Sequence, residues 1–189
     1  MKKKLGILLA LVCLATLAFA QEAPSIKFSV GGGAYLDIGI PMWENADGAV
    51  VGVGGYGFFD FTYAEIDAGI GYYRLTDDKI YGAALTTGLL LKYPFEFGKF
   101  AIFPAAGIRL TVPLTMSYDG DSVDGFETKD HLRFGFQGGF GVDLPLGKSL
   151  FLRTTALCNF DLFAPGENPN DETFYSIGPV IKIGVGYKF

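Results

Sequence analysis

The sequence predicts an all-β chain, an eight-stranded antiparallel up-and-down transmembrane β-barrel, and three observations support this prediction. Apolar and polar residues alternate with a period of two along much of the chain. Eight such segments are each long enough to cross a bilayer as a tilted strand, which takes about 9–11 residues. The connections between the segments are alternately long and short, as in membrane barrels with tight turns at one end.

The composition agrees with this fold class. The 189 residues are 50% hydrophobic and include 27 glycines and 18 phenylalanines, which is too apolar for a disordered chain and too rich in glycine for a helical bundle. The length suits one domain. Beyond the first twenty positions no run of about 18 apolar residues follows, so the sequence excludes a helical membrane protein.

Residues 1–20 are expected to be a cleaved signal peptide. Three lysines at positions 2–4 precede an apolar run over 5–19, and the residues before Gln21 are A-F-A, the pattern of a signal-peptidase site. Residues 21–189 are then the barrel domain. Cleavage would also remove Cys13 and leave Cys158 without a partner for an internal disulfide.

The charge of the mature chain argues against one class of partner. Cleavage removes three of the 15 basic residues and none of the 20 acidic ones, which leaves 12 against 20 and a net charge of −8. Such an acidic domain disfavours nucleic-acid binding.

The eight expected strands differ in how clearly they alternate. The first and last alternate best, and the second and fourth least, because the glycines of GVGGYGFF and the leucines of LLLKY blur the two faces. In order, the segments are 26–40, 49–60, 63–74, 81–93, 99–112, 132–144, 149–161 and 174–189.

The connections provide an independent test of this assignment. The long ones are 41–48, the stretch around 76–79, 113–131 and 162–173. The short ones lie near Phe61 and over 94–98 and 145–148. An even strand count places both chain ends on the side of the short turns, which is the periplasmic side in bacterial barrels.

The two faces of each strand decide between a membrane barrel and a soluble one. A lipocalin-like barrel would turn its apolar residues inward, whereas the charges here fall on the face that carries the glycines. In hydrocarbon a sheet must close on itself to pair its backbone, so we expect apolar residues against lipid and a polar network in the lumen. Its expected members are Asp37, Glu65, Asp67, Lys92, Arg109, Arg133, Asp143, Arg153 and Lys182.

The width of the lumen favours a plug over a pore. An eight-stranded barrel has an interior that its own side chains fill, so the five basic and four acidic groups of the expected network are interpreted as a packed polar plug. Inward glycines would free some space, and a narrow conduction path is therefore kept as the alternative.

Aromatic residues gather near strand ends, where membrane interfaces are expected to lie. The expected girdle residues are Tyr72, Tyr73, Tyr93, Phe95, Phe97, Phe100, Phe174, Tyr175, Tyr187 and Phe189.

The final residues, VIKIGVGYKF, resemble the C-terminal signal of outer-membrane barrels, and with the signal peptide and strand count the chain resembles the OmpA/OmpX-like small barrels over residues 21–189. The resemblance implies an outer-membrane location, contact with outer-membrane lipid, and recognition by the barrel-assembly machinery. It departs from OmpA in that the sequence stops at the barrel, so cell-wall anchoring is not implied. The residues that would carry the assembly signal are Ile181, Ile183, Val185, Tyr187 and Phe189.

Small barrels include lipid-modifying enzymes, but the sequence offers no catalytic group. The one histidine, His131, adjoins Asp130, and neighbours along a strand point to opposite faces. A Ser-His-acid site needs both partners beside the imidazole, and the H-x-S pattern of outer-membrane lipid A deacylases is absent. We therefore expect no enzymatic activity, no cofactor and no metal centre.

The segment 118–130 is rich in acids, and Asp119, Asp121 and Asp124 form a candidate weak cation-binding loop. It lacks the order of an EF-hand, because Val123 takes the fifth position and Gly125 comes one place late. A solvated acidic loop is the favoured interpretation.

The four long connections together hold twelve acids against Lys79 and Lys129, which predicts a strongly negative outer surface. The favoured function is a structural and surface-interaction role through these acidic loops, with an extracellular or host ligand as partner. The alternative is a small pore or a conduit for ions or hydrophobic molecules.

Overall fold

The computed structural model describes residues 27–42, 48–76, 79–122, 132–163 and 175–189. The expected signal peptide, residues 1–20, lies outside the described residues. In the part of the chain that is described, no helix is sufficiently long and apolar to span a membrane.

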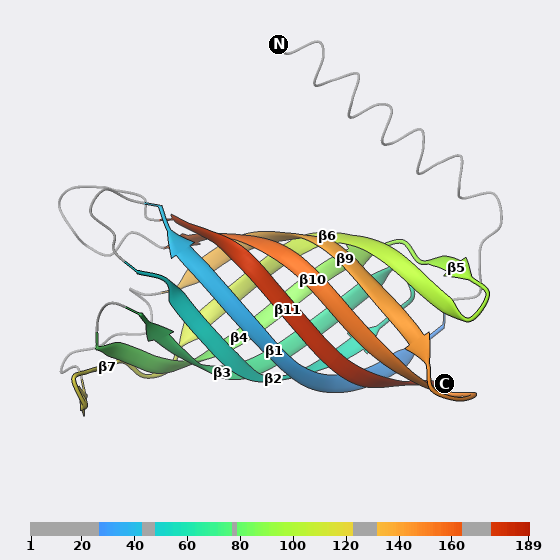
Figure 1. Ribbon diagram of the computed structural model, residues 1–189, viewed down its shortest axis with the longest axis horizontal. Helices are drawn as coiled ribbons and strands as arrows, with labels where there is room; N and C mark the ends of the chain where they lie inside the picture. Colours follow the sequence, from blue (N-terminus) through green and yellow to red (C-terminus); the bar gives the residue numbers. More distant parts are fainter. Residues whose placement is uncertain (1–26, 43–47, 77–78, 123–131, 164–174) are drawn as a thin grey trace, which may run out of the picture.

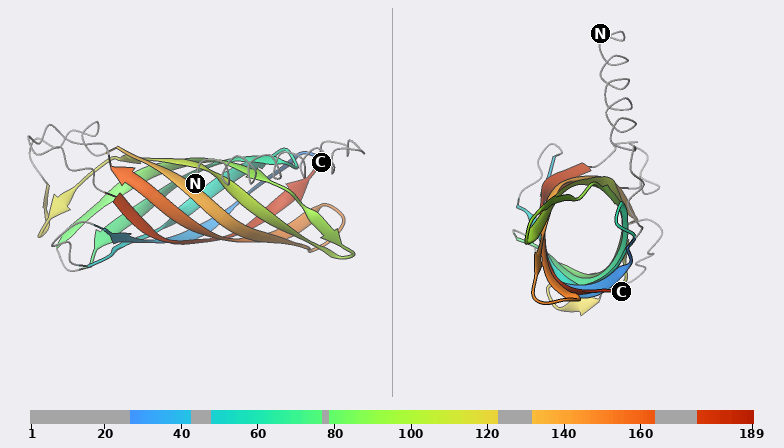
Figure 2. Two further views of the ribbon diagram at one scale, coloured as in Figure 1. Left: turned by 90° about the horizontal axis from the view of Figure 1, so that it is seen from above. Right: turned by 90° about the vertical axis from the view of Figure 1, so that its right-hand side faces the viewer.

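Eight long antiparallel strands form a closed barrel in the described residues (Figures 1 and 2). Each strand pairs with the next one along the chain, and the first and last close the ring, with Ser29 opposite Lys188 and Pro41 opposite Ser176. The long strands are β1 Ser29–Pro41, β2 Val50–Asp60, β3 Ala64–Leu75, β4 Ile80–Lys92, β6 Phe100–Pro113, β9 Arg133–Pro145, β10 Leu150–Phe163 and β11 Tyr175–Lys188. This confirms the predicted fold class.

The two ends of the barrel differ in their connections. At the turn end, which carries the C-terminus in Figure 1, the long strands are joined by 61–63, 93–99 and 146–149. At the opposite, loop end they are joined by 42–49, 76–79, 114–132 and 164–174. Both β1 and β11 meet the turn end, as the even strand count requires.

Three short strands lie in segments that the sequence analysis assigned to a turn or a loop. β5 (Phe95–Phe97) pairs with the start of β6, so the predicted turn over 94–98 is a longer hairpin that bends at Gly98, whose φ is 60°. β7 (Ser117–Tyr118) and β8 (Asp121–Ser122) form a small ribbon, and β7 pairs with the loop end of β4.

In β2 and β4, whose two faces were ambiguous in the sequence, the structure shows which residues face the lumen. In β4, Leu91 is 64% exposed on the outside of the barrel, whereas its neighbour Leu90 is 1% exposed in the lumen. In β2, Phe59 lies outward and Asp60 is buried inward. One register therefore places every outward side chain against lipid, since a slip of one residue would reverse the faces.

Glycines let neighbouring strands approach closely. At some positions the structure has no room for a larger side chain, and at others it has. A Cβ added at Gly178 of β11 would collide with the carbonyl group of Ile38 on β1, while one added at Gly55 of β2 would find only the Gly33 carbonyl oxygen, 3.7 Å away.

We therefore expect Gly178→Ala to destabilise the barrel by about 1–3 kcal/mol, the usual range for overpacking. Gly55→Ala, the matched control, should change stability by less than about 1 kcal/mol and in the stabilising direction, because alanine narrows the unfolded ensemble. Denaturant titration of both variants in the same vesicles measures the difference. Equal stability of the two variants would contradict the strand contact at Gly178.

Candidate functional site

Charged side chains from the strands line the lumen of the barrel. Eight of the nine expected residues are less than 9% exposed there, and the ninth, Arg133, is half-buried with its guanidinium 5.5 Å from the centre of the Tyr73 ring. They fall into three groups along the barrel axis.

The group nearest the turn end is built around Arg153 of β10. Its guanidinium donates to Asp143 Oδ1 at 2.7 Å and Oδ2 at 2.6 Å, to Asp60 Oδ2 at 2.7 Å, and to Glu65 Oε2. Lys92 of β4 adds contacts of 2.5 Å to Asp60 and 3.3 Å to Glu65. Five strands are joined through this Arg153 cluster, which consists of Asp60, Glu65, Lys92, Asp143 and Arg153.

Aromatic rings close the space around the same guanidinium. The Arg153 Cζ atom lies 4.8 Å from the centre of the Phe58 ring, 5.0 Å from Phe151 and 5.1 Å from Phe103. All three rings are at most 3% exposed. Because cations are attracted to ring faces, the rings add to the ionic contacts of Arg153, and the cluster is both charge-paired and enclosed by aromatic side chains.

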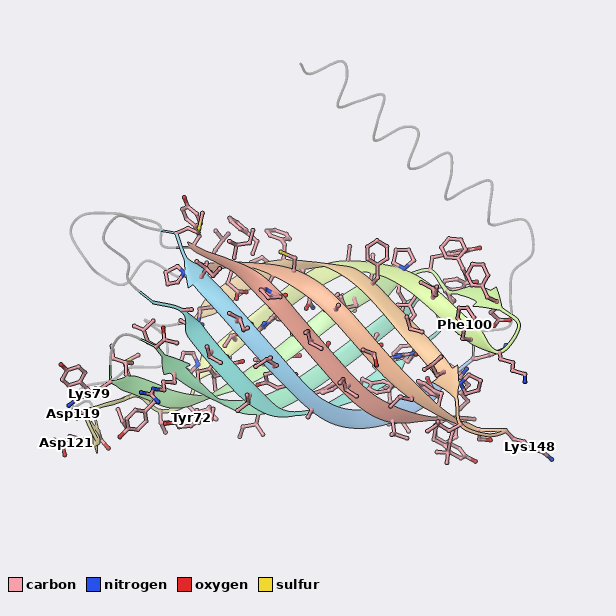
Figure 3. All side chains as sticks on the ribbon, viewed as in Figure 1. Tyr72, Lys79, Phe100, Asp119, Asp121 and Lys148 are labelled. Atoms are coloured by element: carbon pink, nitrogen blue, oxygen red, sulfur yellow. The ribbon has the colours of Figure 1, made fainter. Side chains whose placement is uncertain are left out.

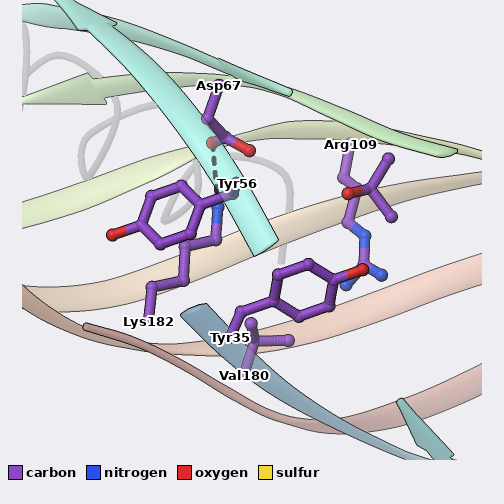
Figure 4. Close-up of a pocket in the computed structure, with 7 residues that line it drawn as sticks. Tyr35, Tyr56, Asp67, Arg109, Val180 and Lys182 are labelled. Carbon is purple, nitrogen blue, oxygen red and sulfur yellow. Dashed lines mark hydrogen bonds and ion pairs between the residues drawn. The ribbon is translucent and has the colours of Figure 1, made fainter. Parts of the chain in front are cut away.

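The middle group joins β3 and β11. Lys182 Nζ donates to Asp67 Oδ2 at 2.8 Å and lies 5.5 Å from the centre of the Tyr56 ring. Figure 4 shows this pair beside Tyr35 and Arg109, around a cavity of about 10 Å³. That volume is room for about one water molecule.

The group nearest the loop end is built around Arg109 of β6. Its guanidinium donates to Asp37 Oδ2, to the Tyr73 hydroxyl at 3.2 Å, and through Nε to Thr111 Oγ1 at 3.2 Å. The hydroxyls of Tyr35 and Tyr73 are 3.2 Å apart. Arg109, Asp37 and the two tyrosines thus form a group of hydrogen-bonded side chains in the lumen, which we call the Arg109 group.

Two buried acids and most of the inward aromatics were missed by the sequence reasoning. Asp60 and Asp161 are 4% and 6% exposed, so the described lumen holds six acids against five bases rather than four against five. Asp60 follows two phenylalanines at the end of a strand with blurred faces, and Asp161 falls at the very end of the expected seventh strand. Alternation continued from Gly54 to Asp60 and from Arg153 to Asp161 would have found both.

The expectation for Tyr73 was wrong. It was assigned to the aromatic girdle, but it is 6% exposed inside the barrel, since its neighbour Tyr72 takes the outward position. At the turn end, expected girdle rings and further aromatic rings lie in mutual contact. The contacting pairs are Phe28–Phe61, Phe59–Phe61, Tyr63–Tyr93, Tyr93–Phe95, Phe97–Phe100 and Tyr187–Phe189. Phe174 lies outside the described residues.

The apolar exterior and charged interior are those of a membrane barrel, and the comparison with protein families gives the same result. The model of the outer membrane protein beta-barrel domain matches residues 6–189. The chain belongs to this family. No curated protein matches this outer-membrane barrel protein.

Three solved structures are similar to this outer-membrane barrel, and the first of them shares its fold. Neisserial surface protein A is 16% identical, with a TM-score of 0.56 over 86% of this chain and 97% of that chain. The N-terminal β-barrel domain of Pseudomonas aeruginosa OprF is 14% identical, with a TM-score of 0.42 over 85% of this chain and 97% of that one. Ail of Yersinia pestis is 12% identical, with a TM-score of 0.46 over 87% and 99%. At these identities the likeness concerns the fold alone.

The remaining candidate residues of the barrel protein lie at its two ends. Asp119 is paired with Lys79 at 2.6 Å, and Asp121 is exposed at the loop end (Figure 3). Asp124 and His131 lie outside the described residues. Within the described ranges no group of three His, Cys, Asp or Glu side chains is placed to hold a metal ion. The five assembly-signal residues point outward and are exposed: Ile181, Ile183, Val185, Tyr187 and Phe189.

Proposed function

We propose that this protein is a closed outer-membrane barrel with a structural and surface-interaction role, which it performs through acidic loops at its loop end. The observation that supports this proposal is the set of paired side chains in the lumen. The Arg153 cluster joins five strands, the Arg109 group joins β1, β3 and β6, and three phenylalanine rings lie around the Arg153 guanidinium. A barrel without a free passage leaves its loops as the part available to partners.

The charge of the loop end gives this role its chemistry. Twelve acids fall in the four long connections, against Lys79 and Lys129. Of these, Asp119 is held by Lys79 and Asp121 is exposed. With the loop end facing the exterior, as in bacterial barrels with short periplasmic turns, the surface would attract basic partners or divalent cations.

Neutralising the acids of segment 118–130 tests the surface role. A variant that carries Asp119→Asn, Asp121→Asn, Asp124→Asn, Glu127→Gln and Asp130→Asn should bind polylysine several-fold more weakly than the unaltered barrel at low salt, because exposed charges act through a screened potential. Binding is measured on proteoliposomes with fluorescent polylysine.

The matched control changes the same end in the opposite direction. Lys79→Gln with Lys129→Gln makes the loop end more negative and should strengthen polylysine binding. Equal binding by both variants and the unaltered protein would count against a surface role for the acidic loops.

A small pore is the second candidate, and one observation favours it. Near the loop end, Gln137 Oε1, both amide atoms of Asn159, and Asp161 Oδ1 are buried without a hydrogen-bond partner in the described structure. Buried polar groups are ordinarily paired with protein or water, so this part of the lumen suits water. Stable channels formed by the purified protein in planar bilayers would favour this candidate.

We also infer that β11 carries an assembly signal read by the barrel-assembly machinery. Its outward residues alternate up to Phe189, which is 77% exposed. Deleting Phe189 should lower the yield of heat-modifiable barrel in the outer-membrane fraction several-fold, while Leu146→Ala, an exposed apolar change in a turn, should not. Unchanged yield after the deletion would remove this inference.

A further inference from the structure

Three lysines gather on one side of the turn end. Lys99 lies in the turn between β5 and β6, Lys148 in the turn between β9 and β10, and Lys188 is the last residue of β11, and all three are exposed. The backbone brings them together, since β6 pairs with β9 and the Lys188 amide donates to the Ser149 carbonyl at 2.8 Å. Figure 3 shows Lys148 at the tip of this end. We call this set the lysine rim.

The lysine rim is not neutralised by the protein. No acid in the described part of the chain lies within ion-pair distance of these three ammonium groups, whereas Lys27 has Glu96 at 3.8 Å and Lys79 has Asp119 at 2.6 Å. Lys188 Nζ lies 5.0 Å from the centre of the Phe151 ring, at the mouth of the lumen. The three ammonium groups are therefore available to an outside anion, those of Lys99 and Lys148 on the turns and that of Lys188 at the inner edge of the strand end.

An apolar surface continues directly from the lysine rim along the outer wall. Leu146 is 59% exposed, and Leu150 and Tyr187, which face each other across β10 and β11, are each 47% exposed. The Leu146 amide donates to the Leu150 carbonyl at 2.9 Å, so the turn that presents Lys148 is fixed to this wall.

The aromatic girdle gives the depth of this surface in the membrane. Outward rings of Tyr187 and Phe189 contact each other, as do those of Phe97 and Phe100. Such rings lie at the level of the lipid headgroups. Lys99 lies between Phe97 and Phe100 in its hairpin, and Lys188 lies between Tyr187 and Phe189. The lysine rim is therefore at the level of these rings and of the lipid headgroups.

We propose that the lysine rim binds an anionic phospholipid of the leaflet at the turn end. The lysines hold the phosphate and the headgroup, and one acyl chain lies along Leu146, Leu150 and Tyr187. The assignment of that leaflet to the periplasmic side rests on the orientation in the proposed function, whereas the binding itself does not. A free phosphate ion would use the same ammonium groups but not the apolar wall, and a zwitterionic lipid would use only the wall.

The expected strength follows from the charges. A lysine near an anionic membrane surface contributes about 1 kcal/mol, which is about fivefold in affinity for each lysine. Removal of all three should therefore weaken binding by at least tenfold even with partial screening, and salt should weaken it as well.

The experiment is a native mass-spectrometry titration of the folded barrel in detergent with phosphatidylglycerol and, separately, phosphatidylcholine of the same acyl chains. The test variant carries Lys99→Gln, Lys148→Gln and Lys188→Gln. The matched control carries Arg74→Gln, Lys79→Gln and Lys129→Gln, which removes three positive charges at the loop end or in its long connections. Heat-modifiable migration verifies that each variant is folded.

We expect the unaltered barrel and the control to bind phosphatidylglycerol within about twofold of each other, and the test variant to bind it at least tenfold more weakly. Equal affinity for phosphatidylcholine, an equal loss in the control, or displacement of the lipid by millimolar inorganic phosphate would each overturn the proposal. Because the lumen and the acidic loops are untouched in the test variant, this outcome is independent of the surface role.

Discussion

Replacing Arg153 with methionine is expected to lower the free energy of unfolding of the barrel by about 3–5 kcal/mol, the range for removing one member of a buried ionic network. The guanidinium holds three carboxylates that are each less than 9% exposed, those of Asp60, Glu65 and Asp143. Without it, among the described residues, Lys92 remains to compensate Asp60 and Glu65, and Asp143 loses the ion pair with Arg153. Methionine keeps much of the side-chain volume between the three rings, so the loss reports mainly on charge.

Urea titration of the barrel in phospholipid vesicles measures this change. Lys27→Met serves as the control, because it removes a cation from an exposed pair with Glu96 at 3.8 Å, and such pairs are worth less than about 1 kcal/mol. Adding Glu65→Gln and Asp143→Asn to Arg153→Met should restore part of the stability, since fewer uncompensated charges stay buried. A loss no greater than that of the control would contradict the role of Arg153.

The strands and their two faces could be predicted from the alternation of apolar and polar residues along each strand. A period of two assigns each residue to one face, and wherever the alternation is clean, as in β1 and β11, the expected and observed faces agree. The three consecutive leucines at 89–91 show the limit, because a run of apolar residues has no phase of its own. The phase there comes from the neighbouring strands, with Leu90 opposite Glu65 and Gly107.

The pairs across the lumen could not be predicted for a different reason. Arg153 meets Glu65 across 88 positions of sequence, and Lys182 meets Asp67 across 115. Which side chains share a level depends on the tilt of the strands and the stagger of their register in the closed barrel. The sequence could thus nominate the charged residues of the lumen but not their partners, and it gave no reason to expect phenylalanines around a guanidinium.

Emptying both levels of the lumen is expected to turn a non-conducting barrel into a channel. We expect the unaltered protein to give no stable conductance in planar bilayers, because the Arg109 group and the Arg153 cluster place hydrogen-bonded side chains inside the narrow lumen of an eight-stranded barrel. A variant with Tyr35→Ala and Arg109→Ala opens only the first level and should stay closed. Adding Phe103→Ala and Arg153→Ala to that variant should produce stable unitary currents.

The comparison of the two variants locates the barrier. If the variant with only Tyr35→Ala and Arg109→Ala already conducts, the Arg153 cluster does not seal the turn end. The unpaired polar atoms of Gln137, Asn159 and Asp161 would then belong to a path that the Arg109 group closes. If the unaltered protein conducts, the closed-barrel function fails and the pore takes its place. Heat-modifiable migration must show that the fourfold variant is folded. If the Arg109 group and the Arg153 cluster each close the lumen, currents should appear only when both are removed, since two barriers in series block independently.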